Sequence, residues 1–303
     1  MSSQESRWSD GTYHIPVMAD EVVARLVLGG ETAILDCTVG DGGHALRILE
    51  HSRCFLVGID KDEDALTAAA ERLSRYKGRF LLTKADFREA RMVLARAGIP
   101  KVDGVLFDLG VSLRQVMDPS RGFSYRGDAL LDMRMDRAQS LTAIDLLATC
   151  GEEELARILR EFGEERYARR IAHLICSERE RQPVTTATQL VKLIYRAIPA
   201  RARRTGGHPA RRTFQALRIA VNRELDGLDR ALEGAFYITK PGGRVVVLSY
   251  HSLEDAVTKE VFKRMEAAGM ALISDKKPLR PSVKEIEKNP RSRSAKLRAA
   301  ILV

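Results

Sequence analysis

A glycine-rich stretch near the N-terminus has the residue types to bind a nucleotide-like cofactor. It runs Asp36-Cys-Thr-Val-Gly-Asp-Gly-Gly-His44, between the apolar run 33–35 and a helical pattern. Glycines at such a position let the backbone turn sharply and approach a ligand, and the following helix offers free N–H groups. Asp60 ends the next apolar run, where a carboxylate can bind both ribose hydroxyls of an adenosine cofactor. We predict an adenosine site, with an ordinary strand-to-helix turn as the alternative.

Two further acids follow later apolar runs. Asp86-Phe87 could frame an adenine, although Phe87 fits a core position equally well, and Asp108 ends the fourth run. No third glycine completes the G-x-G-x-x-G spacing after Gly42-Gly43, which argues against an NAD-linked oxidoreductase. The order of loop and acids is similar to that of S-adenosylmethionine-dependent methyltransferases of the Rossmann-like class.

The elements that must position these residues alternate between strand and helix. Apolar runs predict strands at 33–35, 54–59, 80–83, 102–107 and 244–249, with a closing strand at 296–303. Amphipathic stretches lie between most of them, so we predict a doubly wound α/β fold with a parallel sheet. Right-handed crossovers would bring the strand ends, and therefore the acids, to one edge.

The alternation is interrupted by a long helical segment. Short amphipathic helices follow to about residue 212, which predicts an inserted helical substrate-recognition domain at 113–212. The sheet domain is then split into 1–112 and 213–303. Residues 214–237 are predicted to form one helix.

Composition excludes several classes of protein. With 303 residues, 45% of them hydrophobic and 30% charged, the chain can bury a core and has no apolar run that would span a membrane. The polar stretch 1–13 lacks a signal peptide, so we expect a cytoplasmic protein. Four separated cysteines and six histidines show no ligand spacing, and neither a disulfide framework nor a metal site is expected.

The net charge of +9 is concentrated in two segments. Residues 181–223 contain ten basic residues and no acidic one, and residues 276–303 contain nine basic and two acidic residues. Clustered Lys and Arg favour a polyanion because they release counterions from phosphates. Nucleic acid is the predicted partner, with a solvated basic surface as the alternative.

Nine ordered motifs make the resemblance specific. They are His14-Ile-Pro-Val17, the glycine stretch Asp36 to His44, Asp108-Leu-Gly-Val-Ser112, Arg121-Gly-Phe-Ser124, Leu131-Asp-Met-Arg-Met-Asp136, Gly163-Glu-Glu-Arg166, Arg212-Thr-Phe-Gln-Ala-Leu-Arg218, His251-Ser-Leu-Glu-Asp255 and Asn289-Pro-Arg-Ser-Arg293. Together they closely resemble the RsmH (MraW) family, which methylates the exocyclic N4 of a cytidine in the decoding region of bacterial small-subunit (16S) ribosomal RNA.

The resemblance implies a fold, a cofactor and a partner. It implies a Rossmann-like class I sheet with S-adenosyl-L-methionine as cofactor, and small-subunit ribosomal RNA or an assembled 30S subunit as partner. By motif, the family's cofactor contacts fall on Gly42, Gly43, His44, Asp60, Phe87, Asp108 and Gln115. Two departures are visible: Ser112-Leu-Arg-Gln115 replaces the common Ser-Ser-Pro-Gln, and Tyr250 replaces a common Phe.

Amine methylation needs alignment with the methyl donor and an acceptor for the amine hydrogens. We expect Asp108 to be that acceptor, with Ser112 as a weaker helper, while the resemblance equally assigns Asp108 to the cofactor. Tyr250 is predicted to stack on an extruded cytosine. His251 is expected either to fix its loop or to cap the next helix.

RNA contacts are expected from aromatic and basic residues. Asp132, Arg134 and Asp136 are predicted to order the loop that enters the insertion. Stacking and phosphate contacts are predicted for Phe123, Tyr125, Arg201, Arg203, Arg204, Arg211, Arg212, Arg291 and Arg293. A non-catalytic RNA-binding module on the same fold is the remaining alternative.

Overall fold

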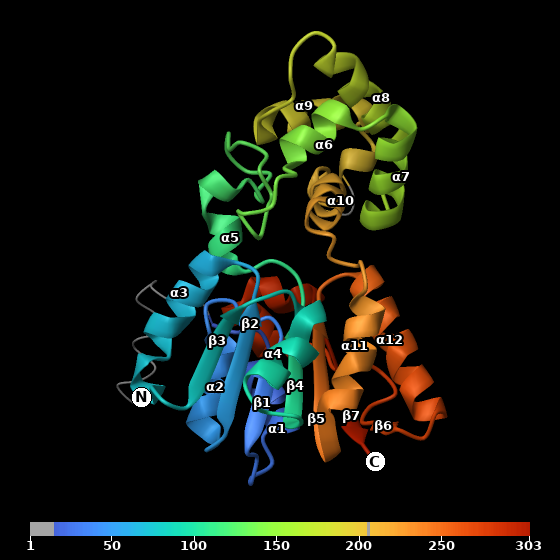
Figure 1. Cartoon of the computed structure of the whole chain (residues 1–303). Helices are drawn as coiled ribbons and strands as arrows, with labels where there is room; N and C mark the ends of the chain where they lie inside the picture. The colour runs from blue at the N-terminus through green and yellow to red at the C-terminus, as the bar shows by residue number, and fades with distance from the viewer. Residues whose placement is uncertain (1–14, 205–206) are drawn as a thin grey trace. The chain divides into compact units, whose positions relative to one another are not determined.

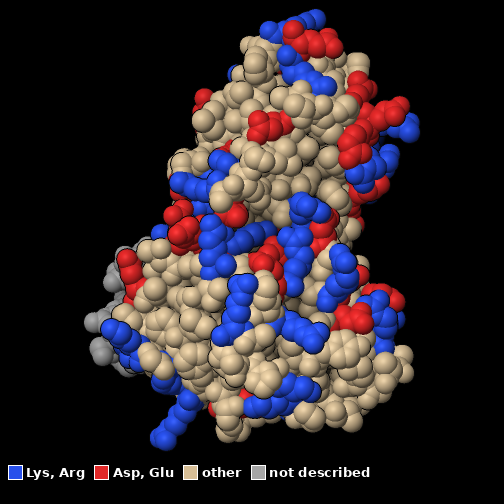
Figure 2. Space-filling model, viewed as in Figure 1, with Lys and Arg blue, Asp and Glu red and all other residues tan. Residues whose placement is uncertain are grey.

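The computed structural model describes residues 15–204 and 207–303 and divides into two compact units. We call Met1–Gly110 with Leu225–Val303 the sheet unit and Val111–Glu224 the helical unit (Figure 1). His14, in the first motif, lies outside the described residues. Basic and acidic side chains are interspersed over the face shown in Figure 2. Within the described residues, no helix combines the length and apolar character needed to cross a membrane.

The described part of the sheet unit contains one seven-stranded sheet in the order β3-β2-β1-β4-β5-β7-β6. Its strands are β1 (Ala33–Asp36), β2 (Phe55–Asp60), β3 (Phe80–Lys84), β4 (Val102–Asp108), β5 (Thr239–Ser249), β6 (Ala271–Ile273) and β7 (Lys296–Leu302). The first five strands run parallel, and β7 lies antiparallel between β5 and β6. The predicted α/β sheet is confirmed. Strand β6 was not predicted, because three residues are too few to give a recognisable strand pattern.

Helices cover both faces of the sheet. The α-helices of this unit are α1 (Ala19–Leu26), α2 (Gly43–His51), α3 (Glu63–Arg72), α4 (Ala90–Arg96), α11 (Leu228–Ile238), α12 (Ser252–Ala267) and α13 (Val283–Lys288). Alternate residues of β4 enter different cores because side chains alternate along a strand. Phe107 packs with residues of α4, α11 and α12, whereas Leu106 packs with α1 and α2. Burial on both faces explains the continuous apolar runs in the sequence.

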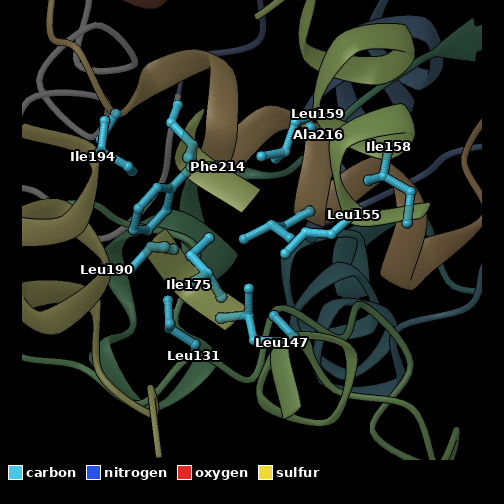
Figure 3. Packing of buried hydrophobic residues seen from close by; sticks show 14 of the residues in the cluster. Leu131, Leu147, Leu155, Ile158, Leu159, Ile175, Leu190, Ile194, Phe214 and Ala216 are labelled. Carbon is cyan, nitrogen blue, oxygen red and sulfur yellow. The ribbon is translucent and has the colours of Figure 1, made fainter. Parts of the chain in front are cut away.

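The helical unit has a core of its own. Its α-helices are α5 (Leu113–Met117), α6 (Ala143–Thr149), α7 (Glu152–Gly163), α8 (Ala168–Arg179), α9 (Ala187–Ala197) and α10 (Arg211–Asn222). Figure 3 shows side chains from several of these helices, Leu155, Ile175, Leu190 and Phe214 among them, pointing toward one another. Short 3-10 helices complete the chain at Ser74–Tyr76, Phe87–Glu89, Pro119–Arg121, Ala202–Arg204 and Pro290–Ser294.

The prediction of one helix over 214–237 is wrong. The chain breaks after α10, where Arg223 takes the left-handed conformation with φ of 52°, and α11 begins after Gly227. Phe214 and Leu217 belong to the core of the helical unit, whereas Phe236 belongs to that of the sheet unit. The helical unit therefore extends over Val111–Glu224, beyond the expected end at residue 212.

Candidate active site

Three carboxylates lie at the carboxyl ends of neighbouring parallel strands. Asp36, Asp60 and Asp108 end β1, β2 and β4, and β1 pairs with both of the others. The loop between β1 and α2 is tied to this edge, because the amide of Gly40 donates to Asp60 Oδ2 at 2.9 Å. Edges of this kind are where open α/β sheets bind ligands.

Gly42 and Gly43 let the start of α2 pack closely against neighbouring segments of the chain. Gly42 caps the helix in the left-handed region with φ of 78°, and a Cβ on it would lie 3.3 Å from the Cα of Ala69. A Cβ on Gly43 would lie 3.2 Å from Pro16. No side chain at these positions covers the first amides of α2, and such free amides favour anionic or hydrogen-bond-accepting groups.

Asp36 is the most perturbed acid of the site. Its side chain is buried, and burial raises its pKa to about 7 although the nearby His44 lowers it. The amide of Thr38 donates to Oδ1 at 3.1 Å, whereas Oδ2 is buried without a hydrogen-bond partner among the described residues. A buried acceptor without a partner is costly, and a bound ligand with a donor or a positive charge would satisfy it.

Asp60 is held by backbone amides on both oxygens. Gly40 donates to Oδ2 and Asp62 donates to Oδ1, each at 2.9 Å. Burial raises the pKa of Asp60 to about 6, although these two amides lower it. Each carboxylate oxygen has two acceptor positions, so the residue can still accept hydrogen bonds from ribose hydroxyls.

Asp108 is fixed by contacts from three directions. Its amide donates to Thr38 Oγ1 at 2.6 Å, and its Oδ1 accepts from the Tyr250 hydroxyl at 2.6 Å. Its Oδ2 lies 3.3 Å from Nε2 of His44, which is buried in the first turn of α2. The site residues Asp108, His44 and Tyr250 are thus brought together.

Tyr250 supplies an anchored donor to this group. Burial, and then the Asp108 carboxylate, raise the pKa of the Tyr250 hydroxyl well above its ordinary value, so the group stays protonated and can donate. Its backbone amide donates to Glu254 at 2.8 Å, and its ring packs against the core formed with α1 and α2. Tyr250 therefore has a contact that its predicted role, stacking on a cytosine, did not include.

His251 is the N-cap of α12. Its Nδ1 accepts from the amide of Glu254 at 3.4 Å, and the Glu254 carboxylate accepts from the amide of His251. Of the two roles considered for His251, the structure shows helix capping. Capping of this reciprocal kind typically contributes about 1 kcal/mol to helix stability.

Phe87 begins a short 3-10 helix after β3, beside the edge of the sheet that carries Asp60. Its ring meets Phe107 edge-on, with 6.2 Å between the ring centroids, and packs against the core that includes residues of α4 and α11. Asp86 caps the same turn and binds Arg88 through both of its oxygens. Phe87 is only half-buried, so an adenine contact and a core role are compatible.

Ser112 and Gln115 belong to the helical unit, where they cap α5 together. The amide of Gln115 donates to the Ser112 hydroxyl at 3.2 Å, and the amide of Ser112 donates to Oε1 of Gln115 at 3.0 Å. Gln115 is buried. Ser112 and Gln115 therefore have a local structural role, capping α5, in addition to the roles predicted for them.

The loop before α6 is held by polar side chains, of which Arg121 and Asn222 are buried. Asp132 binds Arg134 through both oxygens, at 2.9 and 2.7 Å, as expected for residues that order the loop. Arg121 donates to Met135 O, and Asn222 donates to Met133 O. Sequence reasoning missed Asn222, because its contacts span more than eighty residues of the chain.

The predicted RNA contacts separate into buried and exposed groups. Phe123 is 8% exposed within the helical core, so the prediction that it stacks on a base is wrong. Tyr125 is half-buried and stacks on His208. Arg203 is half-buried, and the side chain of Arg204 lies outside the described residues. The exposed arginines are Arg201, Arg211, Arg212, Arg291 and Arg293.

The fold and the site define a class of protein. The strand order, the antiparallel β7, the glycine loop after β1 and the acids ending β1, β2 and β4 are those of a Rossmann-like methyltransferase. The chain belongs to the MraW methylase family, whose model matches residues 11–302, in agreement with the resemblance seen in the sequence.

Proteins with similar sequences agree with this membership. The chain is 48% identical to "Ribosomal RNA small subunit methyltransferase H" of Symbiobacterium thermophilum, over 95% of this chain and 96% of the relative. It is 49% identical to the protein of the same name from Thermotoga neapolitana, over 96% of each. An rRNA methylase structure from Streptococcus thermophilus covers 94% of this chain and 93% of its own, with 12% identity and a TM-score of 0.42.

Proposed function

We propose that this protein transfers the methyl group of S-adenosylmethionine to the exocyclic N4 of a cytidine in the decoding region of small-subunit ribosomal RNA. The observation that carries the proposal is the convergence of Asp36, Asp60 and Asp108 on one sheet edge beside the glycine loop. Whole-length similarity to small-subunit ribosomal RNA methyltransferases supports the choice of substrate.

The residues at this edge fit S-adenosylmethionine. Asp36 offers a buried oxygen that has no hydrogen-bond partner among the described residues, which suits the positive charge of the cofactor, and Asp60 can accept from its ribose. The family's cofactor contacts fall on Gly42, Gly43, His44, Asp60, Phe87, Asp108 and Gln115. When bound, the cofactor supplies an electrophilic methyl group on a positively charged sulfur.

Asp108 is the proposed acceptor for the amine. The lone pair of a cytosine amine is delocalised into the ring, so a fixed acceptor is needed as positive charge develops on nitrogen. Tyr250 fixes Oδ1 of Asp108 by donating to it, and Oδ2, which lies 3.3 Å from His44 Nε2, has a second acceptor position for an amine hydrogen. Ser112 remains a proposed helper.

The exposed arginines are the proposed contacts to RNA phosphates. Arg201, Arg211 and Arg212 belong to the helical unit, which we propose recognises substrate, and Arg291 and Arg293 lie on a 3-10 turn of the sheet unit. The turn is anchored by buried Asn289, whose side chain donates to Ile15 O at 3.2 Å. Because ribosomal subunits are the proposed substrate, we expect the protein to act in the cytoplasm.

The deciding experiment is transfer of a labelled methyl group from S-adenosylmethionine to small ribosomal subunits that lack the modification, followed by mapping of the product. We expect N4-methylcytidine at one position of the decoding region. Label at another atom or base would contradict the proposed substrate. Cofactor and RNA binding without any transfer would favour the non-catalytic RNA-binding module instead.

A further inference from the structure

A series of π systems runs through the helical unit from its core to its surface. The Tyr125 ring meets Phe214 edge-on at 5.8 Å and stacks on His208 at 4.4 Å, with 12° between the planes. His208 contacts Tyr195 at 6.0 Å, and the guanidinium carbon of Arg203 lies 5.4 Å from the Tyr195 ring centroid. Figure 3 shows the inner end, where Phe214 lies beside Ile194 and Leu190.

Exposure rises along this series. Phe214 is 4% exposed, Tyr125 and His208 are half-buried, and Tyr195 on α9 is 37% exposed. Burial and the charge of Arg126 lower the pKa of His208, so its ring is neutral near pH 7 and stacks on Tyr125 as an uncharged partner. Tyr195, the most exposed ring, therefore packs against rings that are more deeply buried in the helical unit.

Arg203, whose guanidinium lies over the Tyr195 ring, has no acidic partner among the described residues. On the same helix, Arg196 forms an ion pair with Glu178 at 3.2 Å. Arg203 forms no ion pair with any described residue, and its Nε is buried without a hydrogen-bond partner there. Nearby in the chain, the exposed Arg201 and Arg211 likewise have no acidic partner among the described residues. A stack that served only the fold would gain from a neutralising acid, and residues 181–223 contain none.

We propose that the Tyr195–Arg203 pair stacks an unpaired base of single-stranded RNA, with His208 and Tyr125 as its support. Aromatic rings beside arginines are the common means of holding single-stranded nucleic acid, because every base has a π face and every nucleotide a phosphate. Bases within a duplex are already stacked and are not offered to such a pair. This inference rests on RNA being the substrate, as proposed above.

The test compares Tyr195→Leu with Tyr237→Leu. Both tyrosines are exposed on α-helices, and Tyr237 lies on α11 outside the basic segments. Affinity is measured for a short single-stranded RNA from the decoding region, for its duplex, and for the same strand with abasic positions. We expect Tyr195→Leu to weaken single-strand binding roughly 5- to 100-fold. Duplex binding and the Tyr237→Leu control should not change.

Two results would overturn the stacking pair. One is an unchanged single-strand affinity in both Tyr195→Leu and Arg203→Gln, with far-ultraviolet circular dichroism showing that both variants are folded. The other is equal binding of intact and abasic strands by the unaltered protein. Neither result bears on methyl transfer, which the labelling experiment measures separately, so failure of the stacking pair and failure of the proposed function are distinguishable.

Discussion

At the scale of single residues, the site is a set of carboxylates whose environments differ. Asp36 is buried, and one of its oxygens has no hydrogen-bond partner in the described part of the chain. Asp60 accepts from two backbone amides, and Asp108 accepts from a tyrosine hydroxyl. These different surroundings suit different tasks. Burying an ionised carboxylate such as that of Asp36 is unfavourable by itself, but the bound form is stabilised when a cationic ligand pairs with it.

Replacing Asp108 separates catalysis from cofactor binding. In Asp108→Asn the Tyr250 hydroxyl can still donate to the remaining carbonyl oxygen, but the negative charge is lost. We expect methyl transfer to fall roughly 100-fold, in line with loss of one preorganised electrostatic contact. Titration with S-adenosylmethionine measures affinity independently. Full turnover with weakened cofactor binding would show that Asp108 serves the cofactor alone, and Asp229→Asn on the exposed side of α11 is the control.

Asp36 should make stability depend on pH. Its pKa is raised from 3.8 to about 7, so the folded state binds the proton more tightly than the unfolded state. Its contribution is therefore most favourable below pH 4 and is lost as the pH rises toward 7. We expect Asp36→Asn to unfold at the same denaturant concentration as the unaltered protein at pH 4. At pH 7 it should be more stable by up to about 4 kcal/mol. Parallel pH profiles would contradict this account.

At the scale of elements, parallel strands made much of the site predictable. Because the ends of such strands meet at one edge, the acids after β1, β2 and β4 could be grouped from the sequence. The contact of Tyr250 with Asp108 could not, because it depends on the register of β5 against β4 across more than a hundred intervening residues. Phe123 was misassigned because its neighbours in the sequence are mostly polar, and only the tertiary packing buries its ring.

The glycine loop can be tested with a matched pair of glycines. Gly42 and Gly98 both have positive φ, at 78° and 71°. A Cβ on Gly42 would have neighbouring atoms within 4 Å, whereas one on Gly98 would have none among the described residues. We expect Gly98→Ala to cost about 1 kcal/mol of stability from backbone strain, with cofactor affinity unchanged. Gly42→Ala should cost more and weaken cofactor binding, because Ala69 blocks the new methyl group. Equal effects of the two changes on cofactor affinity, measured by calorimetry, would argue against the close approach.

A second pair of glycines tests the packing of α7 on α10. A Cβ on Gly163 would lie 2.5 Å from the carbonyl oxygen of Arg212, whereas one on Gly234 in α11 would meet no described residue within 4 Å. We expect Gly163→Ala to destabilise by about 1–3 kcal/mol through overpacking. Gly234→Ala should stabilise by about 0.5–1 kcal/mol through helix propensity. Chemical denaturation measures both, and a neutral Gly163→Ala would show that the two helices can separate without cost.

At the scale of the whole molecule, the charge is a difference between unlike segments. Residues 181–223 and 276–303 together contribute +17 (10 + 9 − 2), so the rest of the chain carries −8 against a total of +9. An acidic remainder suits a sulfonium cofactor, and the basic segments suit phosphates.

The salt dependence of RNA binding should report the second basic segment. In the double variant Arg291→Ala/Arg293→Ala, the slope of log affinity against log salt should become shallower by about 1.4, at roughly 0.7 per lost phosphate contact. Lys259→Ala/Lys263→Ala removes the same charge from exposed positions of α12 and should leave the slope unchanged. If both double variants shift the slope equally, the protein binds RNA by its overall charge rather than through this turn.

The position of the helical unit between β4 and β5 has a consequence for synthesis. About 130 residues separate the end of β4 from the start of β5, its partner in the sheet. At about 5–20 residues per second, translation of that interval takes roughly 7–26 s. During this time β4 has an unpaired edge, and its apolar side chains lack the partners that later segments supply. The helical unit, whose residues are all made within this interval, can fold first, and the nascent sheet must avoid aggregation or rely on a chaperone until β5 emerges.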